Sequence, residues 1–164
     1  MARTRFNDHP CSVARTIDLL GDSWTPLIMR EAYYGVRRFD QFQASLGIGR
    51  NVLATRLKHL TAAEIFRKVA YQERPTRHEY RLTAKGLDFF SVIAAMQAWG
   101  DKWLFGDAGV PIVWNHRETG ARLTPMVVDA TTREPLKLQD VRESPGPAFP
   151  KDPELITQRF GARS

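Results

Sequence analysis

The feature that most constrains this fold is a pair of short helical patterns that meet at a glycine-containing turn and precede two extended runs. The stretch "FDQFQASLG" (39–47) predicts a two-turn helix, and residues 49–62 predict a second helix of about three turns. "LGIG" joins them, which is typical of a helix-turn-helix. Residues 65–71 and 78–82 then predict two strands, with Pro75 in the turn between them. A hairpin directly after a helix-turn-helix predicts a winged helix.

The second helix of this pair has two chemically different faces. Its leucines recur at i, i+4 and i+7, the spacing of one buried helical face: Leu53, Leu57 and Leu60. The opposite side carries hydrogen-bond donors, Asn51, Thr55 and Lys58, Arg50 lies in the first turn, and the stretch has no acid. Arg can bond guanine O6 and N7, Asn can bond adenine N6 and N7, and the Thr methyl can contact thymine. The pattern therefore predicts a helix that enters the major groove of DNA.

The charge distribution agrees with an anionic partner. The chain has a net charge of +6, and residues 1–103 carry 16 Lys and Arg against 10 Asp and Glu, whereas residues 104–164 carry 8 of each. A localised basic surface favours nucleic acid or an acidic membrane face. Phosphate contacts release counterions, so binding to DNA is expected to weaken steeply with salt.

The basic side chains around this helix fall into three pairs. Arg37 and Arg38 precede the first helix of the pair and are predicted to contact phosphates. Arg74 and Arg77 flank the hairpin turn and are predicted to enter a neighbouring minor groove, where narrow A·T tracts have a deeper negative potential. A third pair on the first strand has two open interpretations, phosphate contacts or solvated side chains: Arg67 and Lys68.

Helices are also predicted on both sides of the helix-turn-helix. One covers residues 12–20, a second begins after Ser23 as its N-cap and ends at Gly35, and a long one covers about 83–105. The long helix is apolar around most of its circumference and must be covered. A second subunit would supply that cover, while residues 1–22 and the C-terminal segment are the alternative.

The expected architecture is α+β and mostly helical. Residues 1–105 are predicted to form a winged helix-turn-helix domain with a long C-terminal dimerisation helix. Residues 106–164 are predicted to form a small β-ribbon extension with a Pro-rich tail, in which Glu143–Pro153 is a semi-extended arm and "PELITQRF" is a final helical turn or two.

The stretch from Cys11 to Leu60 and its continuation resemble one bacterial protein family. The shared motifs are a Cys-x-Val near the N-terminus, "GDSWT", "RRF", the leucine helix, "EYRLTAKG" and "AWGDKW". In combination they resemble the HxlR family of transcription regulators, which are related to MarR-type winged-helix proteins. The resemblance spans about residues 10–104. It implies a homodimeric DNA-binding repressor or activator in which the helix at 49–62 enters the major groove, the hairpin is the wing, and operators are inverted repeats.

The same resemblance suggests a role for Cys11, the single cysteine. Some family members sense electrophiles or oxidants with a cysteine at this place. Cys11 precedes a predicted helix and lies four residues before Arg15, which is compatible with a reactive sensor cysteine. With one cysteine, only a bridge between two subunits, a mixed disulfide or an adduct can form. The alternative is a buried interface cysteine.

Residues 106–164 resemble the C-terminal extension of longer family members, through "HRETG", "LTPMVVDA", "REPL", "DVR" and "SPGP". In some members cysteines at these turns suggest a zinc knuckle. This sequence has none there, so no metal or other cofactor is expected, because structural zinc needs about four sulfur or nitrogen ligands. Hydrogen bonds are expected to hold the turns.

Other function classes fit less well. The four histidines are scattered and no catalytic motif occurs, so the chain is predicted not to be an enzyme. A winged helix that binds protein would present an apolar or acidic face. A DNA-binding regulator gated by a small aromatic or electrophilic effector remains a real alternative. Aromatic residues that could line its pocket, unless they are plain core, are Trp24, Tyr33, Tyr34, Trp99 and Trp103.

The sequence also bears on the compartment. No apolar run approaches the roughly 18 residues of a membrane span, and the N-terminus lacks the apolar segment of a signal peptide. A single cysteine excludes a disulfide within the chain. We therefore expect a cytoplasmic protein whose partners are double-stranded DNA and a second copy of itself, without a membrane partner.

Overall fold

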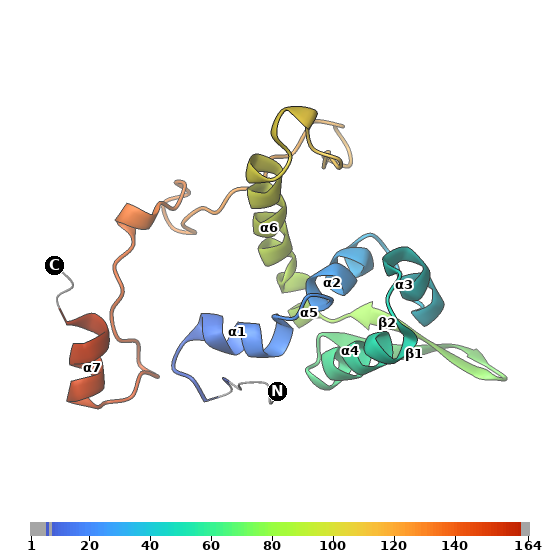
Figure 1. The fold of residues 1–164 in the computed structure, drawn as a ribbon, viewed down its shortest axis with the longest axis horizontal. Helices are drawn as coiled ribbons and strands as arrows, with labels where there is room; N and C mark the ends of the chain where they lie inside the picture. Colours follow the sequence, from blue (N-terminus) through green and yellow to red (C-terminus); the bar gives the residue numbers. More distant parts are fainter. Residues whose placement is uncertain (1–5, 7, 162–164) are drawn as a thin grey trace. The chain divides into compact units, whose positions relative to one another are not determined.

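The computed structural model describes residues 6 and 8–161, which form two compact units. One unit comprises Met1–Leu19 and Val127–Ser164, and the other comprises Leu20–Met126. The second unit holds the predicted helix-turn-helix and hairpin (Figure 1). The elements along the chain are α1 (Ser12–Leu20), α2 (Thr25–Tyr33), α3 (Phe39–Leu46), α4 (Arg50–Ala62), β1 (Phe66–Glu73), β2 (Thr76–Leu82), α5 (Ala84–Asp88), α6 (Phe90–Trp103), η1 (Gly106–Ala108), η2 (Leu138–Asp140) and α7 (Pro153–Phe160).

The winged helix-turn-helix predicted from the sequence is confirmed. Helices α3 and α4 pack on each other, α2 packs on α3, and α4 packs on β1. The turn between α3 and α4 begins at Gly47, whose φ of 63° lies in the left-handed region that favours glycine. The core beneath these elements is apolar, and its largest fully buried side chains include Phe42, Phe66, Ile28, Met29, Ile48, Leu53, Leu57, Leu60 and Ile65.

The hairpin is longer than the sequence suggested. Strands β1 and β2 pair antiparallel from Phe66 opposite Leu82 to Glu73 opposite Thr76, so only Arg74 and Pro75 remain between them. A register shift between Ala70 and Gln72 marks a β-bulge. Figure 1 shows the hairpin projecting beyond α3 and α4 as a wing. A bridge between Arg38 and Glu79 adds the chain before α3 to the other edge of β2.

The predicted long helix over 83–105 is wrong in one respect, because it is divided into α5 and α6 at Phe89. Thr83 caps α5 by accepting a hydrogen bond from Gly86 N, and its hydroxyl donates to Glu64 O at 2.5 Å. A Cβ at Gly86 would overlap the Ile65 carbonyl oxygen, so this close approach requires glycine. Glycine is also a weak helix former, and these tertiary contacts override the helical pattern of the sequence.

The predicted β-ribbon after α6 is also wrong as a regular element. Within the described residues it is present only as two isolated bridges, Asn115 with Arg122 and Val128 with Pro135. Local hydrogen bonds hold the turns, as expected. The Asp129 carboxylate, for example, accepts hydrogen bonds from Thr131 N at 2.9 Å and Thr132 N at 2.8 Å. These two bonds lower the pKa of Asp129, and the bond from Thr132 N has the larger effect. The predicted final helix is confirmed as α7, which Asp152 caps by accepting from Glu154 N.

Candidate nucleic-acid interface

Helix α4 presents the two faces that the sequence predicted. Leu53, Leu57 and Leu60 are all 0% exposed and fix one side of the helix to the core. The opposite side is exposed and includes Asn51, Thr55 and Lys58, with no acidic residue anywhere in the helix. Arg50, in the first turn, is exposed as well, although its spacing from Leu53 and Leu57 places it nearer the leucine side. The first turn of a helix in the major groove contacts base edges, and here that turn holds the Arg and Asn side chains.

Two contacts prepare this face for a ligand. The Thr55 hydroxyl donates to Asn51 O at 2.8 Å, so this hydroxyl is engaged with the helix backbone. The Arg50 guanidinium lies 5.3 Å from the centre of the Phe39 ring on α3, a cation–π contact that restrains its long side chain. Arg50 therefore loses less rotamer freedom when it binds a partner.

Asp22 holds α4 in place, a role that sequence reasoning missed. Its carboxylate accepts hydrogen bonds from Trp24 N at 2.9 Å, from Thr25 N at 3.0 Å and from the Thr25 hydroxyl. Arg56 Nε, on α4, lies 3.2 Å from Asp22 Oδ1, within ion-pair distance though off the direction of a hydrogen bond. Asp22 thus joins the N-terminus of α2 to α4. The predicted N-cap, Ser23, is wrong, because the N-cap position is Trp24 and the carboxylate that accepts from this turn belongs to Asp22. The signal in the sequence was the "GDSWT" motif itself.

The basic residues before α3 lie at its N-terminus and on the edge of β2. Arg37 and Arg38 are both exposed, and the Arg38 guanidinium stacks 4.3 Å from the centre of the Tyr71 ring at the bulge of β1. Gln41 Oε1 accepts from Arg38 N at 3.0 Å, and Arg37 O accepts from Tyr80 N at 2.7 Å. These bonds fix the backbone from which both guanidinium groups project.

The wing carries exposed arginines at its end. Arg74 lies in the turn and Arg77 lies on β2 opposite Gln72, and both are exposed. Arg67 and Lys68 are exposed on β1 nearer the domain. Lys68 Nζ lies 5.6 Å from the centre of the Tyr80 ring, so this side chain packs along the hairpin. The basic residues of the wing and of α4 belong to the same compact unit.

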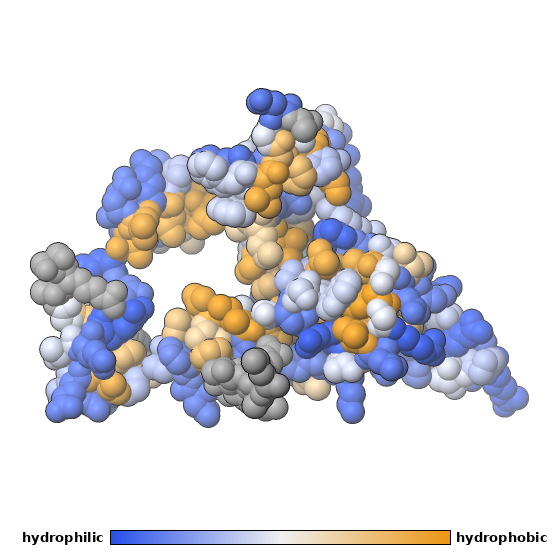
Figure 2. Space-filling model, viewed as in Figure 1, coloured by the Kyte–Doolittle hydropathy of each residue, from blue (hydrophilic) through white to orange (hydrophobic). Residues whose placement is uncertain are grey.

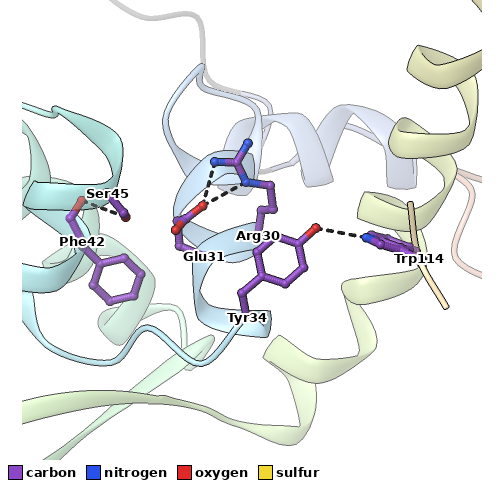
Figure 3. A network of polar contacts seen from close by, with 6 residues as sticks. All are labelled: Arg30, Glu31, Tyr34, Phe42, Ser45 and Trp114. Carbon is purple, nitrogen blue, oxygen red and sulfur yellow. Dashed lines mark hydrogen bonds and ion pairs between the residues drawn. The ribbon is translucent and has the colours of Figure 1, made fainter. Parts of the chain in front are cut away.

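The five aromatic residues predicted as an effector pocket have different surroundings. Tyr34 is 49% exposed and its hydroxyl accepts from Trp114 Nε1 at 3.0 Å (Figure 3). Tyr33 is half-buried, which raises its pKa to about 12, and its hydroxyl donates to Gly86 O at 2.6 Å. Trp24 is partly buried, beside Asp22 at the start of α2. The other two are on α6, Trp99 at 60% and Trp103 at 63% exposure.

Helix α6 carries an apolar stripe that its own compact unit leaves about half exposed. The spacing 4, 3 and 4 places its members on one helical face: Val92, Met96, Trp99 and Trp103, exposed by 41%, 52%, 60% and 63%. Ile93, on another side of α6, is 7% exposed, and α6 packs on α2. Figure 2 shows hydrophobic side chains gathered over α6, in contrast to the hydrophilic wing.

Cys11 lies in the other compact unit, on the wall of a cavity. The thiol residue is partly buried, and the cavity of about 590 Å³ is also lined by Arg15, Arg142, Phe149 and Phe160. The two phenylalanine rings meet edge to face with centres 5.0 Å apart. Cys11 O accepts from Arg15 N at 3.1 Å in the first turn of α1, which places the cysteine at a helix N-terminus as predicted.

The described residues contain no group of three or more His, Cys, Asp or Glu side chains with the geometry of a metal site. In the same part of the chain, no helix combines the length and the apolar character of a membrane span.

The family follows from comparison with known proteins. Residues 19–107 match the model of the HxlR-like helix-turn-helix family. The chain belongs to this family. Its relatives include an uncharacterized HTH-type transcriptional regulator of Mycobacterium tuberculosis, 41% identical over 138 residues that cover 84% of this chain and 87% of the relative. Another is an uncharacterized HTH-type transcriptional regulator of Synechocystis, 37% identical over 58% of this chain and 72% of the relative. These proteins are transcriptional regulators, which confirms the prediction that the chain is not an enzyme.

Solved structures show the same fold. The crystal structure of PA1607, a candidate transcription factor, superposes with a TM-score of 0.79 at 35% identity over 86% of this chain and 99% of that protein. PA1374 of Pseudomonas aeruginosa, another candidate transcription factor, superposes with a TM-score of 0.60. It is 35% identical, and the match covers 91% of this chain and 99% of that protein. The redox regulator HypR in its reduced form superposes with a TM-score of 0.53. It is 27% identical, and the match covers 56% of this chain and 92% of that protein. Because these matches with PA1607 and PA1374 cover 86% and 91% of this chain, they include part of the extension after α6.

Proposed function

We propose that this HxlR-like protein is a sequence-specific transcriptional repressor that inserts α4 into the major groove of its operator. The observation that supports it is the exposed face of α4, which is free of acid and rich in hydrogen-bond donors, beside a wing that carries arginines. Repulsion from phosphates is absent on this face, and the buried leucines set its direction. A helix of this kind fits the width of the groove.

Each basic or polar residue has a proposed role. Arg50 and Asn51 bond base edges, the Thr55 methyl contacts thymine, and Lys58 contacts a base or phosphate deeper along the groove. Arg37 and Arg38 bind phosphates, with Arg38 aligned by Tyr71. Arg74 and Arg77 place the wing in the adjacent minor groove.

The protein acts as a cytoplasmic homodimer on an inverted repeat. The apolar stripe of α6 is the part of the interface that the exposures support best, since four large side chains there are between 41% and 63% exposed. A two-fold dimer presents two α4 helices and so needs an operator with two-fold symmetry. Residues 1–105 form the DNA-binding and dimerisation domain in this proposal, and residues 106–164 form its extension.

Selection from a genomic DNA library at about 0.15 M salt tests the proposal. Purified protein is incubated with sheared DNA from the organism that encodes it, and bound fragments are sequenced over several rounds. An enriched inverted repeat is the expected result. Failure to enrich any sequence at this salt, together with failure to bind any duplex at low salt, would contradict the proposal.

A second candidate function is DNA binding gated by the Cys11 thiol. Two observations favour it: Cys11 lies at a helix N-terminus on a cavity that Arg15 and Arg142 also line, and the fold matches HypR, a redox regulator. Oxidation would then link two subunits through Cys11, or a small electrophile would form an adduct there.

Treatment with peroxide or a quinone separates the gated regulator from the simple one. The wild type is expected to lose operator affinity, whereas Cys11→Ser is expected to keep it. An identical response of both proteins would leave Cys11 as a structural residue and contradict the gate. A non-reducing gel of the treated wild type distinguishes a bridge between subunits from an adduct.

A further inference from the structure

A cavity of about 310 Å³ lies between the end of α2, the hairpin and α5, all within the compact unit that holds the winged helix. Three of its lining residues are cationic: Arg37, Arg67 and Arg81. Three others form an apolar or aromatic wall: Tyr33, Val36 and Leu87. No lining residue comes from α3 or α4, so this cavity is distinct from the face of α4 proposed to bind DNA.

The pairing of the hairpin places two of these arginines directly opposite each other. Arg67 on β1 is the cross-strand partner of Arg81 on β2, so both side chains lie on the same face of the hairpin. Like charges in directly opposed positions destabilise a hairpin. The third arginine is held nearby, because Tyr80 N donates to Arg37 O at 2.7 Å.

The negative charge available inside the protein neutralises only part of this cluster. Arg81 Nε donates to Glu79 Oε1 at 2.5 Å, and Glu79 is 8% exposed. The guanidinium groups of Arg37 and Arg67 have neither an ion pair nor a hydrogen bond to any other residue in the described part of the chain. Two residues that line this concave site therefore carry a positive charge without a counter-charge in the described part of the chain.

The wall of the cavity determines what kind of anion fits. Guanidinium groups bind carboxylates and phosphates through paired hydrogen bonds. The Tyr33 hydroxyl is already bonded to Gly86 O, and burial raises its pKa to about 12, so its ring forms a neutral wall at physiological pH. The volume is that of a small ligand pocket, which is larger than a bare inorganic ion needs.

We propose that this cavity binds a small organic anion, a carboxylate or phosphate monoester attached to an apolar or aromatic body. The anionic group lies between Arg37 and Arg67, and the body lies against Tyr33 and Leu87. Binding relieves the repulsion between Arg67 and Arg81, so the ligand stabilises the hairpin as well as occupying the cavity.

Arg37 connects this site to the proposed regulatory function. It lies two residues before α3 and is one of the proposed phosphate contacts, so a ligand that engages it competes with DNA. The linkage is reciprocal, and DNA lowers affinity for the ligand by the same factor. This competition rests on the proposed DNA-binding function, whereas the binding of the anion does not.

The test uses the full chain and four probes: benzoate, phenyl phosphate, inorganic phosphate and neutral benzamide. Protein amide NMR spectra are recorded during titration with each probe. Benzoate or phenyl phosphate is expected to shift the amide signals of Tyr33, Arg67 and Leu87 saturably. Inorganic phosphate and benzamide are expected to bind at least about tenfold more weakly. The two organic anions distinguish a carboxylate ligand from a phosphate ligand.

Arg67→Gln is the informative variant, because this side chain has no described partner to leave unpaired. It is expected to weaken binding of the preferred probe by about tenfold or more, the loss of a charge-assisted hydrogen bond. Without ligand, its melting temperature is expected to equal or exceed that of the wild type, since the opposed charges are gone. Arg74→Gln is the matched control, with the same charge change at the wing tip, and is expected to alter probe affinity less than about twofold.

Three outcomes would overturn the proposal. One is the absence of saturable shifts with both organic anions. Another is an equal loss of probe affinity in Arg67→Gln and Arg74→Gln, which would indicate diffuse attraction of the anion to a basic surface. The last is inorganic phosphate binding as tightly as phenyl phosphate, which would leave no role for the apolar wall. None of these outcomes depends on DNA binding, which is measured separately on the same variants.

Discussion

The outward faces of α4 and α6 have the same helical geometry and opposite chemistry. On α4, the side opposite a row of fully buried leucines carries Asn, Thr and Lys side chains, and the exposed Arg50 lies in the first turn. On α6, the exposed side carries a stripe that ends in two tryptophans, Trp99 and Trp103. Water solvates the first face well, so the proposed binding of DNA by α4 can be reversible. The second face is costly in water, which favours a lasting protein partner.

The magnitudes support this distinction. A tryptophan buries about 150–250 Å², so covering the exposed part of Trp99 or Trp103 is worth on the order of 2–3 kcal/mol at roughly 25 cal/mol per Å². In a two-fold dimer each contribution counts twice, because the same patch is present on both subunits. This gain is large enough to offset much of the entropy cost of association.

The largest expected effect comes from placing charge on the α6 stripe. Met96→Glu combined with Trp99→Glu is expected to weaken dimerisation by at least about a hundredfold, because two carboxylates per subunit would enter an apolar interface. Analytical ultracentrifugation measures the dissociation constant. Operator affinity is expected to fall in parallel, since one half-site alone binds weakly.

Ser91→Glu is the matched control for that variant. Ser91 is exposed in the first turn of α6, one position before the stripe begins, and there a negative charge suits the helix dipole. Its dimerisation is expected to match the wild type. A stable dimer of the double variant would show that α6 is not the interface and would remove the contrast between the two helices.

Asp22 gives the next largest effect and tests how α4 is held. Asp22→Ala is expected to lower the free energy of unfolding by about 2–3 kcal/mol, because it removes acceptors for three donors and leaves the Arg56 charge partly buried. Urea denaturation measures the change. In a double-mutant cycle with Arg56→Gln, the two losses are expected not to add. Additive losses would contradict a coupling between α2 and α4.

Arg50→Ala examines the polar face directly. It is expected to weaken binding to the selected operator by about 1–3 kcal/mol and to change non-specific binding little. Fluorescence anisotropy with operator and scrambled duplexes measures both. Arg74→Ala, the comparison variant on the wing, is expected to weaken all duplexes more evenly and to lower the salt dependence by about one phosphate contact. If Arg50→Ala lowered the affinity for the operator and for the scrambled duplex equally, Arg50 would be a phosphate contact.

The two faces of α4 could be predicted because each depends on residues close in sequence. The leucine spacing, the glycines at both ends of the turn and the missing acid all lie within residues 46–62, and the structure has α4 at Arg50–Ala62. Helix α1 was predicted at its observed bounds for the same reason. Local patterns of this kind express the periodicity of the helix itself.

The features that were missed depend on residues far apart in the chain. The break at Phe89 lies close to contacts that join Gly86 of α5 to Tyr33 of α2 and to Ile65, in the connection between α4 and β1. The pairing of Asp22 with Arg56 joins residues 34 positions apart. The alternating residues after α6 suggested a ribbon, yet only single bridges form among the described residues there, because most of these side chains are exposed and have little core to bury.

Tyr33 gives the smallest expected effect and concerns the support of α6. Its ring meets Phe90, the first residue of α6, edge to face at 5.2 Å, and its raised pKa of about 12 means that burial disfavours the ionised form. The unfolded chain ionises near 10, so this contribution is present below pH 10 and is lost as the pH rises from about 10 to 12. Tyr33→Phe is expected to lose about 1 kcal/mol at pH 7 and to depend less on pH above 10.

Thermal unfolding at several pH values between 7 and 11 measures this difference. Tyr80, whose pKa burial also raises, remains in both proteins and so contributes equally. Parallel pH curves for the wild type and Tyr33→Phe would show that the Tyr33 hydroxyl is not buried in solution.

The most direct test of the central claim, that the acid-free face of α4 contacts base edges, couples one side chain to one base atom. Each guanine of the selected operator is replaced in turn by 7-deazaguanine, which lacks the N7 acceptor, and affinities of the wild type and Arg50→Ala are measured. Replacement of one particular guanine per half-site is expected to lower the operator affinity of the wild type by about tenfold. The same replacement is expected to leave the affinity of Arg50→Ala nearly unchanged. If every replacement weakened both proteins equally, Arg50 would not contact a guanine and the claim would be contradicted.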